Sequence, residues 1–117
     1  MSSPFPDGRQ DEVRTFYTGV LGLLEVPPPG SLAHLRLVWF SAGEGLELHF
    51  FPGPTDPEAA RHFCLNVDDL EERRERLAAS GYQPYDDTAI PNRPRFFCRD
   101  PFGNLIELTR IEGDYPT

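Results

Sequence analysis

The chain has 117 residues, a length that suggests one domain with a modest but sufficient hydrophobic core. Hydrophobic residues make up 38% of the sequence and include nine Phe, so we expect a packed globule rather than a disordered chain. The net charge is −8 and the sequence contains no Lys, which argues against nucleic acid or an anionic membrane as a partner. No apolar run reaches transmembrane length and no signal-peptide pattern is present, so we expect a cytoplasmic protein.

The N-terminal region predicts one helix after a proline-bearing lead. The first eight residues include Pro4 and Pro6 and are expected to form no normal strand, because proline cannot donate to a strand ladder. Asp7 and Gln10 resemble a capping box for a helix from about Arg9 to about Val20. The apolar face of this helix repeats at helical spacing, and Gly22 follows as its stop; the face comprises Val13, Phe16, Tyr17, Val20 and Leu21.

Strands are predicted after this helix. A short strand at residues 23–26 is broken by the prolines that follow it. A long strand is expected from Ser31 to Ala42, then a hairpin turn at residues 43–45 and a strand from about Leu46 to Phe51. Residues 52–57 have the composition of a linker.

The second half repeats this order. We expect a strand from Arg61 to Val67, then a helix to about Ser80 with Asp68 and Glu71 as its capping box, then a strand at residues 82–85. The arginines at 73, 74 and 76 are interpreted as a solvated helix face that pairs with neighbouring glutamates. Cys64 and Cys98 are the only cysteines, and both are expected to be buried free thiols.

The chain closes with a predicted hairpin over residues 95–110. Asp100 can accept hydrogen bonds from the backbone that follows it, and Pro101 and Gly103 suit a tight turn. Strand alternation places Ile106 and Leu108 on a packing face and Glu107 on the other. A carboxylate in the middle of such a strand lies either at an exposed edge or in a cleft with a partner.

The order of elements indicates an α+β fold built from two βαβββ modules in a single domain. Module one covers about residues 1–53 and module two about residues 58–117. With a helix on one face of each sheet, the opposite faces would form a U-shaped, mostly antiparallel sheet around a cleft. We expect the first strand of module one to be missing, because the chain begins almost at the helix.

Three predicted strands carry a carboxylate or an imidazole on the face opposite the helices. These are Glu47 and His49 on one strand, His62 on the next and Glu107 on the last. If the faces converge, His62, Glu107 and either Glu47 or His49 form a mixed nitrogen and oxygen site. Such ligands suit a divalent metal of the Fe, Mn, Ni, Co or Zn type.

Simpler interpretations stand beside this hypothesis. A single His in a strand is usually an ordinary surface or core residue, and an isolated Glu is usually solvated. Arg95 lies beside the acidic positions and either clamps an anionic substrate or balances local charge. The aromatic side chains Trp39, Phe51, Phe97 and Phe102 are expected to line the cleft, although a plain core would use the same residue types.

Several motifs resemble the vicinal oxygen chelate superfamily, which includes glyoxalases, bleomycin-resistance proteins and extradiol dioxygenases. Residues 13–23 (VRTFYTGVLGL) are similar to the helix signature of that family, and residues 45–50 (GLELHF) to the strand that ends its first module. His62 with residues 67–70 (VDDL) resembles the opening of the second module, and residues 100–108 (DPFGNLIEL) match its closing motif.

The resemblance implies paired βαβββ modules around a metal whose ligands come from the first and last strand of each module. Glu47 or His49, His62 and Glu107 match three of these positions. The fourth, usually a His on the first strand of module one, has no expected counterpart here.

The resemblance implies one of two functions. The first is a metal-dependent enzyme of glyoxalase or dioxygenase type that binds two vicinal oxygens of a small molecule, with Glu47 or Glu107 as general base. The second is a metal-free protein of the bleomycin-resistance type that sequesters a small molecule. Because the missing strand would leave its neighbour unpaired, we also expect a homodimer.

Overall fold

The computed structural model describes residues 2–43, 45–56 and 62–110. Predictions that involve residue 1, 44, 57–61 or 111–117 lie outside these ranges at those positions. The elements in chain order are β1 (Ser2–Phe5), α1 (Gln10–Arg14), the π-helical η1 (Thr15–Val20), β2 (Leu24–Val26), the 3₁₀-helical η2 (Gly30–Leu35), β3 (Val38–Gly43), β4 (Leu46–Pro52), β5 (His62–Asn66), α2 (Leu70–Ala79), β6 (Arg95–Arg99) and β7 (Leu105–Thr109).

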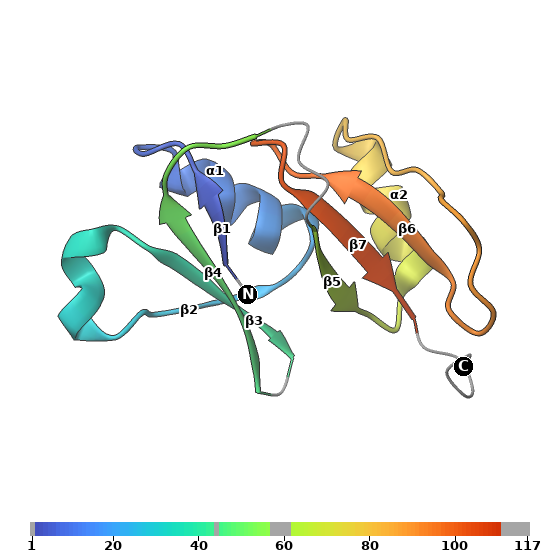
Figure 1. Cartoon of the computed structure of the whole chain (residues 1–117), viewed down its shortest axis with the longest axis horizontal. Helices are drawn as coiled ribbons and strands as arrows, with labels where there is room; N and C mark the ends of the chain where they lie inside the picture. Colours follow the sequence, from blue (N-terminus) through green and yellow to red (C-terminus); the bar gives the residue numbers. More distant parts are fainter. Residues whose placement is uncertain (1, 44, 57–61, 111–117) are drawn as a thin grey trace.

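The strands form two separate sheets, one in each half of the chain. The first has the order β1-β4-β3-β2 and the second the order β5-β7-β6. β1 runs parallel to β4 in the first sheet, and β5 runs parallel to β7 in the second. The remaining neighbouring strands, β2 with β3, β3 with β4 and β6 with β7, are antiparallel. Figure 1 shows the two sheets side by side, with α1 and η1 between them and α2 behind the second sheet. The predicted α+β architecture of two modules is therefore confirmed.

Each helix buries the apolar stripe that its sequence spacing predicts. Val13, Phe16, Tyr17 and Leu21 are buried, and the Tyr17 ring lies 4.4 Å from the Phe50 ring of β4. On α2, Leu70 and Leu77 are buried in the same core cluster as alternate residues of the second sheet. Ala78, the residue after Leu77, is exposed. The other face of each sheet is turned away from the helices, and we call it the open face.

Module one does contain its first strand, so the prediction that this strand is missing is wrong. β1 pairs in parallel with β4, and Ser2 lies opposite His49. The strand tolerates Pro4 because β1 is at the edge of its sheet, where a residue without an N–H need not complete a ladder.

The predicted long strand at residues 31–42 is also wrong in its first half. Residues 30–35 form η2, whose i to i+3 hydrogen bonding begins at the Pro29 carbonyl, and only β3 is extended. The reason is the partner strand: β2 ends at Val26, and the prolines at 27–29 have no N–H with which to continue the ladder. Leu35, within the predicted strand, belongs to η2 and is exposed.

The strand predicted at residues 82–85 reduces to a single bridge. Tyr85 and Phe97 exchange two backbone hydrogen bonds, both 2.8 Å long, and the pairing does not extend into a strand.

Neither predicted capping box forms. The residues that precede α1 and α2 are Arg9 and Asp69, and neither helix start has a side-chain cap. The capping candidates make ion pairs instead: Asp7 with Arg36 and Glu71 with Arg110.

Two arginines of α2 join the modules through backbone carbonyls. Arg73 donates to the Leu21 carbonyl and Arg76 to the Gly19 carbonyl, both at the C-terminal end of η1. Carbonyls at a helix end lack partners within the helix and carry partial negative charge, so a guanidinium is well matched to them. The prediction of a solvated arginine face is therefore wrong for Arg73, whose side chain is only 18% exposed, whereas Arg76 makes its contact at an exposed position.

The closing turn makes a buried polar junction between the modules. Asp100 is 5% exposed and accepts hydrogen bonds from the Tyr17 hydroxyl at 2.6 Å and from two backbone amides, those of Phe102 and Asn104, at 2.9 and 2.8 Å. The Asn104 side chain donates to the Pro4 carbonyl of β1 and to Asp100. The predicted role of Asp100 in its own turn is confirmed, and its bond to Tyr17 was not anticipated.

Phe102, expected in the cleft, lies in the hydrophobic core at this junction. It is 5% exposed and its ring centroid is 6.3 Å from that of Phe5. Turn residues do not alternate as strand residues do, so its direction could not be obtained from strand periodicity.

No helix within the described ranges is both long and apolar enough to cross a membrane.

Tyr17→Phe should destabilise the protein in a pH-dependent way. Burial raises the pKa of Asp100, while the bond from Tyr17 opposes that rise. The stabilising contribution of a group with a raised folded pKa is lost as pH rises through that pKa, and removing Tyr17 raises the pKa further. We expect a loss of about 1.5–3 kcal/mol at pH 7, typical of a hydrogen bond to a charged group, and a smaller loss at pH 4.

Urea denaturation of both proteins at the two pH values measures this difference. Tyr85→Phe is the matched control, because Tyr85 is 43% exposed and should change stability little. Equal losses for Tyr17→Phe at pH 4 and pH 7 would contradict the assigned role of Asp100.

Candidate functional site

The open face of the second sheet carries the candidate residues of module two in adjacent rows. The strand register places Cys64, Glu107 and Phe97 in one row across β5, β7 and β6. His62 lies two residues before Cys64 and Arg95 two residues before Phe97, so both project from the same face. Sequence alternation alone predicts this shared face, because the intervening residues Phe63, Phe96 and Ile106 belong to the core.

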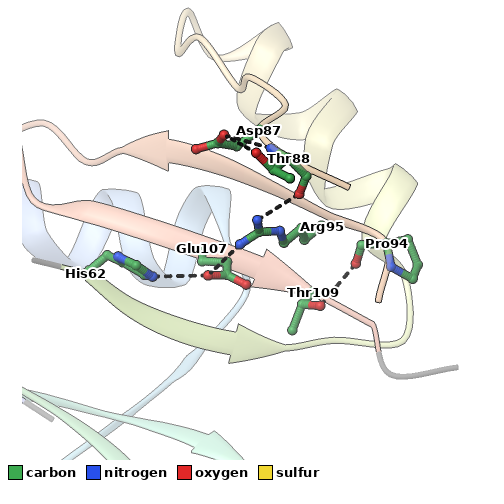
Figure 2. Close-up of polar contacts among 7 residues, drawn as sticks. All are labelled: His62, Asp87, Thr88, Pro94, Arg95, Glu107 and Thr109. Atoms are coloured by element: carbon green, nitrogen blue, oxygen red, sulfur yellow. Dashed lines mark hydrogen bonds and ion pairs between the residues drawn. The ribbon is translucent and has the colours of Figure 1, made fainter. Parts of the chain in front are cut away.

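Glu107 and His62 form a close polar pair on this face. His62 Nε2 lies 3.0 Å from Glu107 Oε1, and the carboxylate side chain is only 10% exposed, compared with 37% for the imidazole. Glu107 belongs to the central strand of its sheet, so neighbouring strands shield it on both sides. Figure 2 shows the imidazole and the carboxylate directed toward each other from β5 and β7.

Arg95 approaches the same carboxylate from β6. Its Nη1 atom lies 3.5 Å from Glu107 Oε1, and its Nη2 atom donates to the Thr88 carbonyl at 2.8 Å. The guanidinium also lies over the Phe97 ring, 5.1 Å from the centroid, a cation–π arrangement. The Arg95 side chain is 16% exposed, so the pair with Glu107 is shielded from solvent and differs from the exposed ion pairs elsewhere on the protein.

Cys64 and Phe97 complete the surroundings of Glu107. The pKa of the Cys64 thiol is raised to about 11, mainly by burial and further by the neighbouring Glu107 carboxylate. The imidazole of His62 meets the Phe97 ring edge-on with centroids 5.2 Å apart, and the Tyr85 ring stacks on the Phe97 ring with centroids 5.8 Å apart. A thiol with this pKa stays protonated at neutral pH, so it does not act as a nucleophile.

A second pair of the same chemistry lies on the open face of module one. Glu47 and His49 are two residues apart on β4, with Glu47 Oε1 3.2 Å from His49 Nε2. The His49 ring is stacked on Trp39 of β3, with centroids 3.6 Å apart and planes 7° apart. A pocket of about 550 Å³ lies against this face, lined by Glu47 and His49 together with Val26, Ser41, Gly43, Gly45 and Leu46.

Trp39 leaves one polar atom unsatisfied. Its buried Nε1 atom has no hydrogen-bond partner among the described residues. Phe51, on the same face of β4, is 39% exposed. This open face therefore presents aromatic surface beside the Glu47/His49 pair, while the Trp39 N–H is shielded from solvent.

The donors fit a divalent metal as two half-sites rather than as one site. Two ligands held at about 2.1 Å from one cation and at a right angle to each other lie about 3.0 Å apart. The 3.0 and 3.2 Å separations within the pairs match this spacing and equally match a direct hydrogen bond. Within the described part of one chain, no three His, Cys, Asp or Glu side chains are grouped closely enough to hold a metal.

The structure thus brings together only some of the predicted site residues. It places His62 with Glu107, places Glu47 with His49, and adds Arg95 and Phe97 to the first pair. It does not group the two pairs within one chain. Strand β1 carries Ser2 and Ser3, not the His that the family resemblance would place on the first strand.

Two contributors to the site were not predicted. The Thr88 carbonyl anchors Arg95, and nothing in the composition of residues 86–94 indicates that role. Cys64 was treated as an inert buried thiol, although its position two residues after His62 places it on the open face.

Comparison with known families and structures identifies similar proteins. Residues 5–108 match the model of the Glyoxalase/Bleomycin resistance protein/Dioxygenase superfamily. No curated protein sequence matches the chain significantly.

Three solved structures illustrate the range of similar proteins. A putative glyoxalase family protein from Bacillus anthracis is 30% identical with a TM-score of 0.85, over 95% of this chain and 91% of that one. An antibiotic-binding protein from Streptomyces sp. CB03234 is 23% identical with a TM-score of 0.71, over 95% and 93%. A fosfomycin resistance protein from Listeria monocytogenes, complexed with Mn(II) and sulfate, is 15% identical with a TM-score of 0.72, over 96% and 87%.

Glu107→Gln should make the Cys64 thiol more reactive. The substitution removes the negative charge that helps to raise the Cys64 pKa, while the larger contribution from burial remains. We therefore expect the pKa to fall from about 11 and the rate of iodoacetamide alkylation at pH 9 to rise, by roughly tenfold for each unit.

Alkylation rates measured by mass spectrometry across pH 7–11 test this expectation. Glu47→Gln removes the same charge from the other sheet and should leave the Cys64 profile unchanged. Cys98 is 0% exposed and should stay unmodified in every variant. An unchanged profile in Glu107→Gln would show that the carboxylate does not act on the thiol.

Proposed function

The chain belongs to the Glyoxalase/Bleomycin resistance protein/Dioxygenase superfamily, and we propose that it is a metal-dependent enzyme acting on a small molecule with two vicinal oxygens. The observation that carries the proposal is the His62–Glu107 pair, with imidazole and carboxylate atoms 3.0 Å apart on an open sheet face. The metal would be a divalent ion of the Fe, Mn, Ni, Co or Zn type, for which this combination of ligands is suited.

The complete site would require two copies of the chain. Each chain offers one pair on each sheet, and a pair supplies only two of the three or four protein ligands that a metal centre uses. A two-fold axis that brings the His62–Glu107 pair of one copy to the Glu47/His49 pair of the other would complete two sites at once. The sequence predicts a homodimer because the first strand of module one is expected to be absent, but β1 is present. The proposal of a homodimer therefore rests on the two half-sites instead.

The bound metal would act as a Lewis acid on the two oxygens of the substrate. The chain's own residues would position the substrate and accept its proton. Glu47 is the better candidate for general base, because its side chain is 50% exposed whereas that of Glu107 is 10% exposed. Glu107, held by His62 and Arg95, would serve mainly as a ligand, with His49 as the ligand from the other pair.

A second candidate function is a metal-free protein that sequesters a small molecule. It is favoured by the aromatic surface on the open face of module one, where Trp39 stacks on His49 and Phe51 is exposed beside a pocket of about 550 Å³. Trp39 is the only Trp in the chain, so its fluorescence would report directly on a ligand bound to this face.

Metal analysis of the purified protein separates these functions. We expect about one equivalent of a transition metal per chain after purification without chelator, as metal enzymes of this kind require. His62→Ala should lose most of it, whereas His34→Ala should retain it because His34 lies on η2, away from either pair. If the wild-type protein stays metal-free after incubation with each of the five metals, the enzyme proposal fails and the sequestering function remains.

Mixed dimers test whether the site is shared between chains. A His62→Ala chain and a Glu47→Ala/His49→Ala chain should each bind no metal alone. Half of the dimers in an equal, re-equilibrated mixture are heterodimers with one intact site, which gives about a quarter of an equivalent per chain. Sites formed within one chain would yield no metal in the mixture, and a monomer in light scattering would also reject the shared site.

A further inference from the structure

Arg95 places a permanent positive charge against the carboxylate that the proposed function assigns to a metal. Its Nη1 atom is 3.5 Å from Glu107 Oε1, and the two side chains are only 16% and 10% exposed. The same oxygen faces His62 Nε2 at 3.0 Å. Arg95 therefore stands where it can neutralise Glu107 without a bound metal, as Figure 2 shows.

Contacts other than Glu107 hold the guanidinium in this place. Nη2 donates to the Thr88 carbonyl at 2.8 Å, and the Phe97 ring lies beneath the guanidinium at 5.1 Å. These two contacts would persist if a cation took over the carboxylate. Arg95 is thus a fixed part of the site rather than a side chain that leaves when a metal arrives.

We propose that Arg95 is a resident counter-ion that competes with a divalent cation for Glu107 and so sets the metal affinity of the module-two half-site. The inference deepens the proposed function and rests on it. A cation that binds Glu107 meets a carboxylate whose charge is already partly compensated, and it is repelled by the guanidinium across a poorly solvated gap. Arg95 acts through its contact with Glu107 and would not itself bind the metal.

The sign of the effect distinguishes this role from a structural one. If Arg95 served only to hold Glu107 in place, its removal would loosen the ligand and weaken metal binding, as loss of outer-sphere partners usually does. If Arg95 competes, its removal strengthens metal binding. The looser 3.5 Å contact of Arg95, compared with 3.0 Å for His62, favours competition over positioning support.

Isothermal titration of the metal-free full chain with Mn²⁺ alone tests the proposal. Arg95→Met removes the charge while keeping an apolar chain over Phe97, and we expect Mn²⁺ to bind about tenfold more tightly than to wild type or better. Arg95→Lys keeps a positive charge and should stay close to wild type. Thermal unfolding verifies that each variant is folded, and Arg95→Gln, which can still donate to the Thr88 carbonyl, replaces Arg95→Met if that variant does not fold.

Arg74→Met is the matched control. Arg74 also lies over a ring of β6, 5.4 Å from the centroid of Phe96, and is also paired with an acid, Asp86. It projects from α2 on the opposite face of the same sheet, because Phe96 belongs to the core. The control removes the same charge from the same module, so an equal gain in both variants would assign the effect to net charge and overturn the proposal.

The titrations separate this inference from the proposed function. If wild type binds Mn²⁺ through His62 but Arg95→Met binds no more tightly, the counter-ion role fails and the metal function stands. If wild type does not bind and Arg95→Met does, the counter-ion role stands and the metal function of the natural chain fails. If neither folded protein binds Mn²⁺, both fail.

Discussion

The buried carboxylate of Asp100 fixes how the two halves of the molecule are joined, and the position of both half-sites depends on it. It belongs to the turn between β6 and β7, yet the Tyr17 hydroxyl from module one donates to it at 2.6 Å. Burial raises its pKa, so leaving it without these donors would be costly. Backbone amides of its own turn supply some of these donors, and the Tyr17 hydroxyl supplies another. The bond from Tyr17 can form only when η1 is packed against the second sheet. Arg73 and Arg76 close the same junction from α2. The polar contacts of Asp100, Arg73 and Arg76 therefore hold the modules together behind the open faces, whereas Glu107 and Thr109 are buried on the open face itself.

The two modules repeat one design and have diverged in how they treat its carboxylate. In each, the last strand is central and carries a Glu beside a His on the open face. Around Glu107 the surface is closed by Arg95, Phe97 and Cys64, and the carboxylate is nearly buried. Around Glu47 the surface is open, with a pocket of about 550 Å³ and the exposed side chain of Phe51 on the same face. A closed half suits a fixed ligand or ion pair, and an open half suits a molecule that must enter and leave.

Sequence periodicity predicted which face of a helix or strand is buried. It failed where the presence of a strand depends on its neighbour in the sheet. The helix faces, the closing hairpin and the shared face of His62 and Glu107 follow from periods of 3.6 and 2, so they were accessible. β1 was missed because Pro4 argues against a strand unless the position of β1 at the sheet edge is known. The strand expected through Leu35 failed because its neighbour stops at Val26. The contact of Arg95 with Glu107 joins residues twelve apart, and its anchor at Thr88 is a backbone carbonyl, which no side-chain pattern reveals.

The choice between a metal enzyme and a metal-free binding protein reduces to how one carboxylate is neutralised. A carboxylate as shielded as Glu107 needs a cationic or hydrogen-bonding partner, because transfer of an unpaired charge from water is unfavourable. His62 alone supplies a hydrogen bond, and only its protonated form supplies charge. Arg95 supplies charge at every pH, and a divalent ion supplies twice as much. The chain already contains Arg95, which neutralises Glu107 without a metal. Binding of a metal is therefore favoured only by the difference between its interaction with Glu107 and that of Arg95. That difference is set by local geometry, which explains how one fold can accommodate both chemistries with few changes in its sequence.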